Sequence, residues 1–130
     1  MKKRIPILLL LSTFIFAGCV APQNSTSTYR QITMDEAAVM MEQESGYVIL
    51  DVRRPDEFAE KRIPGAINIP NETIGTAEIP ELPDKDQLIL VYCRSGRRSK
   101  LAAEKLVALG YTNIVEFGGI NDWKGEVERG

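Results

Sequence analysis

Cys93 and the basic residues after it form the part of the sequence best suited to chemistry. Arg94, Arg97 and Arg98 all lie within five residues of this cysteine. The nucleophilic form of a cysteine is the thiolate, which nearby cations and the N-terminus of a helix stabilise. Gly96 lets the chain turn so that successive backbone N–H groups can bind an anion. The pattern predicts a nucleophilic Cys93 in a cradle made of Arg94, Ser95, Gly96, Arg97, Arg98 and Ser99.

The flanking segments are predicted to place Cys93 at the end of a strand. Residues 88–92 form an uninterrupted apolar run with β-branched side chains, which is typical of a strand buried on both faces. Residues 99–109 predict a helix that ends at Gly110. In open α/β sheets, ligands bind at the carboxyl ends of such strands. A structural cysteine beside a solvated basic turn is the alternative, but packing alone does not account for three arginines. The apolar stripe of the helix is predicted to comprise Leu101, Ala102, Leu106, Ala108 and Leu109.

Strands and helices are predicted to alternate along the rest of the chain. Thr33 and Glu36 form a capping box that starts a helix over 34–44, and Pro55 starts a single helical turn over 55–58. Such alternation favours an α/β fold with a mostly parallel sheet of about five strands and helices on both faces. Short helices are also predicted over 71–77 and around Trp123, and further strands over 31–32, 47–52, 66–69 and 113–117.

The composition restricts the classes of function. A chain of 130 residues is long enough for one domain and too short for two. It contains no histidine, which excludes a Cys–His nucleophile pair, a Ser–His–Asp triad and any histidine-ligated metal. The net charge is −2, and it becomes −5 without Lys2, Lys3 and Arg4, because 13 basic residues then face 18 acidic ones. Nucleic acid is not an expected partner, since binding it requires a basic face.

Residues 1–18 have the layout of a secretory signal peptide. Three basic residues lie within the first four positions, an apolar segment covers 5–16, and Ala17 and Gly18 precede Cys19. The apolar segment is short for a transmembrane helix. The Ala-Gly-Cys sequence resembles a bacterial lipobox, although Phe16 stands where such boxes usually have leucine. The resemblance implies cleavage before Cys19, with lipid on its thiol and on its new amino group.

This N-terminus predicts an exported protein, lipid-anchored to a bacterial cell-envelope membrane on its periplasmic or extracellular face. Residues 19–30 are predicted to be the lipidated cysteine and a flexible tether, because they are small and polar, and residues 31–130 the folded domain. An ordinary cleaved signal with Cys19 free, or an uncleaved anchor, are the alternatives. A disulfide between Cys19 and Cys93 is formally possible, but lipidation would occupy the first of these cysteines.

Four segments resemble the signatures of the rhodanese-like sulfurtransferases. They are the active-site loop, the first signature strand, the turn and strand that follow it, and the C-terminal signature. The segments occur in the order typical of the family across about residues 31–125, so the resemblance covers the whole predicted domain. It implies a rhodanese-like three-layer fold. The segments are residues 93–99, residues 49–53, residues 57–58 with 62–70, and residues 117–119 with Trp123.

The resemblance also implies a reaction. Cys93 would take the outer sulfur of thiosulfate, or of a related small anionic donor, as a persulfide. The acceptor would be cyanide or a thiol, including the thiol of a thioredoxin-like protein. Arg94, Arg97 or Arg98 and the N–H groups of the loop would hold the leaving anion. Asp51 would help to position the site, with Arg53 as its candidate ion-pair partner. The reaction needs neither a metal nor an organic cofactor.

Two other functions remain open. Cysteine-dependent phosphatases and arsenate reductases also bind an anion in a loop with arginine, but their arginine follows five intervening residues, whereas Arg98 follows four. Tyr92 also stands where tyrosine phosphatases commonly have histidine. The second alternative is a non-enzymatic sulfur carrier or redox module, in which a partner protein recognises the oxidised or persulfidated form of Cys93.

Overall fold

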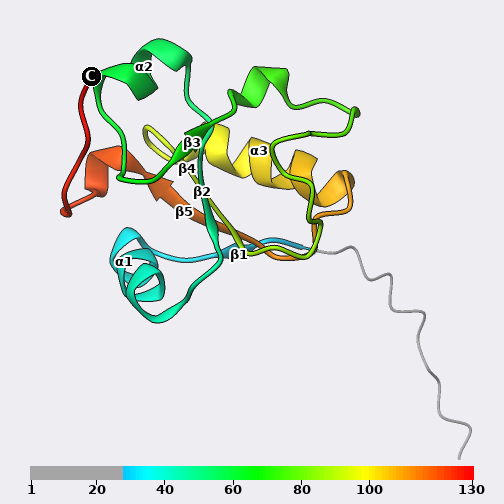
Figure 1. Cartoon of the computed structure of the whole chain (residues 1–130), viewed down its shortest axis with the longest axis horizontal. Coiled ribbons are helices and arrows are strands. Elements are labelled where there is room, and N and C mark those ends of the chain that lie inside the picture. The colour runs from blue at the N-terminus through cyan, green and yellow to red at the C-terminus, as the bar shows by residue number, and fades with distance from the viewer. Residues whose placement is uncertain (1–27) are drawn as a thin grey trace, which may run out of the picture.

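The computed structural model describes residues 28–130, which form a five-stranded sheet between layers of helices (Figure 1). The strands lie in the order β1-β5-β4-β2-β3, and every neighbouring pair is parallel. The predicted α/β fold with a mostly parallel sheet of about five strands is therefore confirmed. The strands are β1 (Arg30–Gln31), β2 (Val48–Asp51), β3 (Ile67–Asn68), β4 (Ile89–Cys93) and β5 (Ile114–Gly119). The helices are α1 (Met34–Gln43), α2 (Pro55–Glu60) and α3 (Arg97–Ala108), with 3-10 turns η1 (Asn71–Thr73) and η2 (Ile120–Asp122).

β4 lies at the centre of the sheet, between β5 and β2. None of its five residues is more than 1% exposed. Ile89, Val91 and Cys93 face the hydrophobic cluster on the α3 side, and Leu90 and Tyr92 face the cluster on the α1 side. A strand that is covered on both faces needs apolar side chains at every position. This explains the uninterrupted apolar run before the cysteine.

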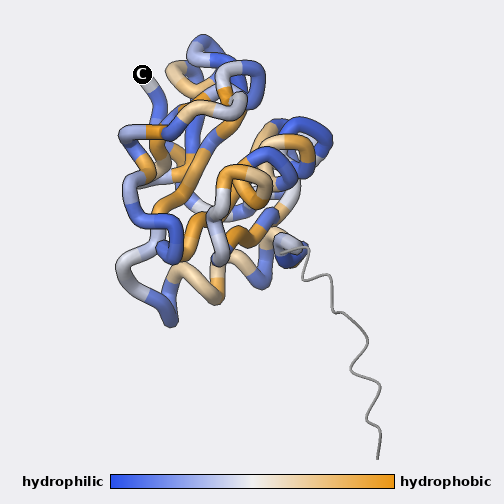
Figure 2. The backbone as a smooth tube through the Cα atoms, turned by 90° about the vertical axis from the view of Figure 1, so that its right-hand side faces the viewer, coloured by the Kyte–Doolittle hydropathy of each residue, from blue (hydrophilic) through white to orange (hydrophobic). Residues whose placement is uncertain are grey.

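Two hydrophobic clusters join the helices to the sheet. α3 contributes Ala102, Ala103 and Leu106 to the cluster on one face, and α1 contributes Met34 and Ala37 to the cluster on the other. Figure 2 shows hydrophobic residues gathered along the inner strands, with mostly hydrophilic segments around them. The helices on both faces confirm the predicted layers, and the carboxyl ends of β2 and β4 lie at the same edge of the sheet.

α3 differs from its predicted form. It begins at Arg97, two residues before the predicted start. Leu101 is 43% exposed while Ala103 is buried, so the assignment of Leu101 to the apolar stripe was wrong. Ala108 is exposed as well. Because an α-helix has 3.6 residues per turn, Leu101 lies about 140° around the axis from Leu106, and the helix packs on the sheet through Ala102, Ala103 and Leu106 instead.

Other element boundaries also differ from the predicted ones. β5 continues through Gly118 and Gly119, because Gly119 is paired with Cys93 after a shift in register. The helix predicted over 71–77 is reduced to the single turn of η1. α2 is longer than the single turn predicted, and β1 begins one residue earlier than predicted.

The N-terminal predictions fall largely outside the described part of the chain. The signal peptide over 1–18, Cys19 and residues 20–27 of the tether are not among residues 28–130. Within residues 28–130, no helix has both the length and the hydrophobicity that crossing a bilayer requires. The chain enters the fold at β1.

Candidate active site

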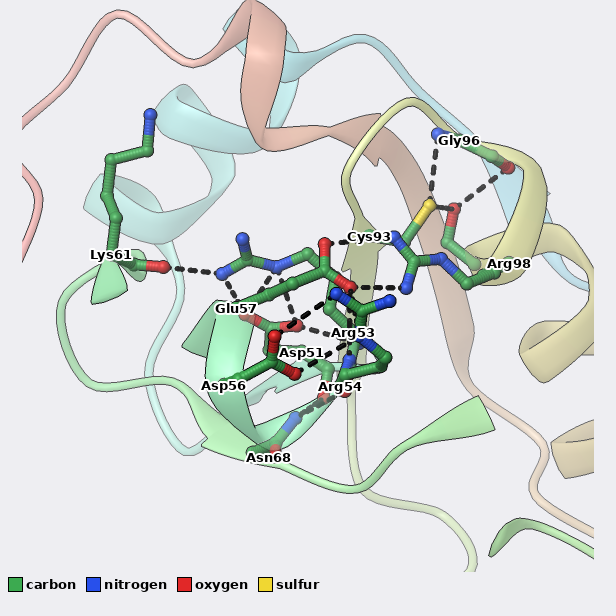
Figure 3. A network of polar contacts seen from close by, with 11 residues as sticks. Asp51, Arg53, Arg54, Asp56, Glu57, Lys61, Asn68, Cys93, Gly96 and Arg98 are labelled. Atoms are coloured by element: carbon green, nitrogen blue, oxygen red, sulfur yellow. Dashed lines mark hydrogen bonds and ion pairs between the residues drawn. The ribbon is translucent and has the colours of Figure 1, made fainter. Parts of the chain in front are cut away.

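The loop after β4 carries the predicted nucleophile. β4 ends at Cys93 and α3 begins at Arg97, so only three residues join them. Gly96, the last of the three, has a φ of +106°, in the left-handed region that favours glycine. This turn brings the Gly96 N–H to Cys93 Sγ, and it donates a hydrogen bond over 3.0 Å (Figure 3). Cys93 is only 1% exposed. Its sulfur accepts this hydrogen bond at the N-terminus of α3.

Ser99 connects the sulfur to a carboxylate on β5. Its Oγ lies 3.3 Å from Cys93 Sγ and donates to Oε1 of Glu116 over 2.6 Å. Glu116 is 2% exposed, and its Oε1 also accepts a hydrogen bond from Gly118 N–H over 2.9 Å. The sequence analysis did not identify Glu116 as a site residue. An acidic residue inside a predicted apolar strand was the available signal, because carboxylates are almost never fully buried without a partner.

Glu57 of α2 holds Arg98 in place. Their side chains form two contacts, of 2.6 and 3.1 Å. The hydrogen bonds from Arg98 lower the pKa of Glu57. The hydrogen bonds to Glu57 likewise raise the pKa of Arg98, and the proximity of Cys93 adds to that rise. Figure 3 shows the Arg98 guanidinium between the Glu57 carboxylate and the sulfur, so it is placed to hold an anion beside Cys93.

The other two loop arginines line different cavities. Arg94 lines a cavity of about 280 Å³ together with Arg53 and Arg129. Arg97 lines a second cavity between α3 and η1, together with Ser95, Arg98 and Leu101. Arg94, Ser95 and Arg97 are all exposed. Gly96 and Ser99 contact the sulfur directly, whereas Ser95, Arg97 and Arg98 line one cavity and Arg94 lines another. That these residues form one anion cradle remains a prediction.

Asp51 and Arg53 form a buried ion pair at the carboxyl end of β2. Arg53 donates to both carboxylate oxygens of Asp51, with a shortest contact of 2.7 Å, and to the backbone carbonyl of Lys61. Asn68 donates to the backbone carbonyls of both residues. Within residues 28–130 neither side chain of the pair is hydrogen-bonded to the loop after β4. The pair instead braces the two ends of α2, the helix that carries Glu57.

Gly118 and Gly119 let β5 approach the loop closely. A Cβ on Gly119 would lie 2.1 Å from the carbonyl oxygen of Arg94 and 2.4 Å from the backbone nitrogen of Ser95. Gly118 has a φ of +93°, and its N–H binds Glu116. Gly119 therefore has a steric reason, because backbone atoms of the loop occupy the space that its side chain would fill, whereas Gly118 is favoured by its positive φ.

The arrangement can stabilise negative charge on the sulfur and bind an anion beside it. The Gly96 N–H donates to Sγ, the Ser99 hydroxyl oxygen lies 3.3 Å from it, and the Arg98 guanidinium interacts with it electrostatically. Over residues 28–130, no three cysteine, histidine, aspartate or glutamate side chains are grouped so as to hold a metal ion. The chemistry that the residues themselves provide is nucleophilic attack by sulfur on an anionic compound.

Comparison with known proteins identifies the family. The family model of the rhodanese-like domain matches residues 33–126, and the chain therefore belongs to this family. The thiosulfate sulfurtransferase PspE of Escherichia coli (strain K12) is 38% identical over 73 residues, which cover 56% of this chain and 70% of PspE. An adenylyltransferase and sulfurtransferase of Meyerozyma guilliermondii is 33% identical over 122 residues, which cover 88% of this chain but only 28% of that protein.

A solved structure supports the same assignment. The structure described as rhodanese with anions from E. coli is 34% identical and has a TM-score of 0.59, covering 65% of this chain and 99% of its own. The predicted rhodanese-like fold is thus confirmed. The relatives support sulfur transfer as the general class of chemistry.

Proposed function

We propose that this protein transfers a sulfane sulfur through a persulfide on Cys93. The donor is thiosulfate or a related small anion, and the acceptor is cyanide or a thiol. The setting of Cys93 carries the proposal, because Gly96 N–H and Ser99 Oγ lie 3.0 and 3.3 Å from its sulfur and Arg98 lies beside it. The similarity to PspE, a thiosulfate sulfurtransferase, supports the choice of donor.

The first half-reaction is a displacement at sulfur. The Cys93 thiolate attacks the outer sulfur of thiosulfate, a new S–S bond forms, and the S–S bond of thiosulfate breaks. Sulfite leaves with the electron pair of that bond, and Arg98 and the Gly96 N–H stabilise the anions that are present before and after transfer. Cyanide or a thiolate then attacks the outer sulfur of the persulfide, which releases thiocyanate or a new persulfide and regenerates the Cys93 thiolate.

A phosphatase or arsenate reductase fits this loop less well. Those enzymes enclose a tetrahedral oxyanion, and their loop has one residue more between cysteine and arginine than the four counted here. In the part of the chain that the structure describes, one backbone N–H, that of Gly96, is hydrogen-bonded to the sulfur. A loop of this size suits a single additional sulfur atom better. A sulfur carrier or redox module would use the same persulfide but would lack turnover with small molecules.

The N-terminal sequence supports a cellular location for the protein. A basic start, an apolar segment and Ala-Gly before Cys19 support export and lipid attachment at that cysteine. The catalytic domain then works at the periplasmic or extracellular face of a bacterial cell-envelope membrane, joined to the lipid by the residues before β1. Small anions and thiols on that side of the membrane, including a thioredoxin-like protein, become the accessible donors and acceptors.

The test is thiosulfate:cyanide sulfurtransferase activity, measured on the full chain beside Cys93→Ser. Both proteins carry Cys19→Ser, which leaves Cys93 as the only cysteine in the reference protein. Intact mass is measured after incubation with thiosulfate alone. We expect thiocyanate formation and a mass gain of one sulfur in the reference protein, and neither in Cys93→Ser.

The absence of both signals from the reference protein would overturn the thiosulfate proposal. Hydrolysis of a phosphate ester or reduction of arsenate by the same protein would then favour the rival class of enzyme. A mass gain without thiocyanate formation would favour the carrier function.

A further inference from the structure

Glu116 is a buried carboxylate that the sulfur-transfer mechanism leaves without a role. It lies in the middle of β5, is 2% exposed, and sits among apolar residues of the same strand. Burial of a carboxylate is costly unless its environment compensates the charge. Within residues 28–130 no cation pairs with Glu116, and its hydrogen-bond partners are Ser99 and Gly118. The carboxylate is therefore held next to the reactive loop by uncharged donors alone.

The contacts of Glu116 lead directly to the nucleophile. Ser99 Oγ is 2.6 Å from Glu116 Oε1 and 3.3 Å from Cys93 Sγ. A hydroxyl has one proton to donate and can also accept. The 2.6 Å contact is short enough for a charge-assisted bond to the carboxylate, so Ser99 donates to Glu116 and its oxygen accepts the thiol proton. The three side chains form a continuous donor–acceptor chain from sulfur to carboxylate.

The protein also lacks a histidine, which is the usual partner of a reactive cysteine. Two other buried or half-buried carboxylates near the site are already paired, Glu57 with Arg98 and Asp51 with Arg53. Glu116 is the carboxylate that is both connected to the sulfur and free of a cation, as far as the described residues show.

We propose that Glu116 accepts the thiol proton of Cys93 through Ser99, and so acts as a positioning residue that maintains the thiolate. The proposal rests on the function proposed above. The S–H bond of Cys93 breaks as its proton passes to Ser99 Oγ, and the hydroxyl proton of Ser99 passes to Glu116 Oε1. The products are a thiolate and a protonated carboxyl group, with no change in net charge or oxidation state. Ser99 then donates to the sulfur, and the carboxyl group donates to Ser99.

The surrounding charges favour this transfer. Arg98, in the first turn of α3, is the cation that interacts with Cys93, and its own carboxylate partners are Glu57 of α2 and, more weakly, Glu72 of η1. The Gly96 N–H points at the sulfur and stabilises the thiolate, whereas Gly118 N–H stabilises Glu116. A single negative charge is therefore shared between the Cys93 sulfur and the Glu116 carboxylate. The cation, Arg98, interacts with the sulfur.

The test is the pH dependence of Cys93 alkylation by iodoacetamide, on the full chain carrying Cys19→Ser. Two coupled groups that share a proton titrate in two steps, so the alkylation rate of the reference protein should rise in two steps with pH. In Glu116→Gln no carboxyl group shares the proton, and we expect the lower step to be lost. Ser99→Ala should lose it as well, and Ser99→Thr, which keeps the hydroxyl, should restore it.

A single step in the reference protein, or a lower step that persists in Glu116→Gln, would overturn the proposal. A purely structural Glu116 would change the stability of the variant and leave the shape of the profile unaltered. If Glu116→Gln does not fold, as judged by circular dichroism, the comparison of Ser99→Ala with Ser99→Thr decides the question. Alkylation requires no sulfur donor, so this result is independent of whether the protein turns over thiosulfate.

Discussion

At the scale of single residues, the surroundings of Cys93 come from both near and distant parts of the sequence. Gly96 and Ser99 follow it closely, and the local pattern of the loop was enough to predict both. Glu57 and Glu116 reach the site from α2 and β5. Their partners could not be predicted from the sequence, because the order and register of the strands decide which side chains meet across a sheet.

The loop arginines should differ in their effect on activity. We expect Arg98→Ala to lower kcat/KM for thiosulfate by about 10- to 100-fold, since a hydrogen bond to a charged group contributes about 1.5–3 kcal/mol and 1.4 kcal/mol corresponds to tenfold. Arg97→Ala is the matched control, because Arg97 is exposed, whereas Arg98 is held in place by Glu57. Equal losses in the two variants would contradict a special role for Arg98.

The ion pair of Glu57 with Arg98 predicts a pH dependence of stability. The hydrogen bonds from Arg98 lower the pKa of Glu57 in the folded protein, so its contribution is present above the unfolded value of about 4.3 and is lost as the pH falls through the folded value. We expect Glu57→Gln to be less stable than the natural sequence at pH 7. The difference should shrink as the pH falls below that unfolded value and the natural side chain becomes protonated too.

Urea denaturation of both proteins at several pH values measures this difference. Other carboxylates titrate in both proteins, so subtraction leaves the contribution of Glu57. A difference in free energy of unfolding that stays constant from pH 7 to pH 3 would show that the pair does not contribute through its charge.

At the scale of elements, the kinds and order of helices and strands could be predicted, because capping residues, apolar runs and glycines act locally. The capping box of Thr33 and Glu36 is one such signal that the structure confirms. The orientation of α3 could not be predicted in the same way, because both Leu101 and Ala103 are apolar and the pattern alone does not decide which of them is buried. The extension of β5 to Gly119 likewise depends on its pairing with Cys93.

The closeness of β5 to the loop makes Gly119 sensitive to substitution. We expect Gly119→Ala to destabilise the protein by about 1–3 kcal/mol or more, as overpacking does, because the added Cβ would lie 2.1 Å from the Arg94 carbonyl oxygen. It should also reduce sulfur transfer, since the loop must move. Gly75→Ala is the control, because a Cβ there meets no atom within 4 Å and the backbone is not in the left-handed region.

Thermal unfolding and the thiosulfate assay, applied to both variants, provide the measurement. Gly75→Ala should unfold within a few degrees of the natural sequence. A Gly119→Ala protein of unchanged stability and activity would mean that the loop can yield without cost.

At the scale of the whole molecule, a rhodanese-like domain is joined to an N-terminus that supports export and lipid attachment. The family and its fold could be recognised from the sequence, because the signature segments lie at their expected positions over residues 33–126. The natural donor and acceptor could not be recognised from the sequence. The residues that line the cavities around Arg94 and Arg97 come from segments that only the fold brings together.

The proposed anchoring predicts how the protein partitions in a cell. Expressed in a bacterium with its own N-terminus, it should be recovered in the membrane fraction and extracted by detergent, because several acyl chains bind firmly to a bilayer. Cys19→Ser should shift the protein away from that fraction or leave it unprocessed. Recovery of the natural sequence in the soluble fraction, at the mass expected for cleavage without lipid, would contradict the prediction and favour an ordinary signal peptide.

The position of β5 in the chain has a consequence for how the protein is made. Cys93 is synthesised before Glu116 and Gly119, which close one side of its loop. Domains generally fold as units during synthesis, and the surroundings of Cys93 cannot be completed before β5 has left the ribosome. The segment from Ile114 to Gly119 is therefore needed both for the sheet and for the site.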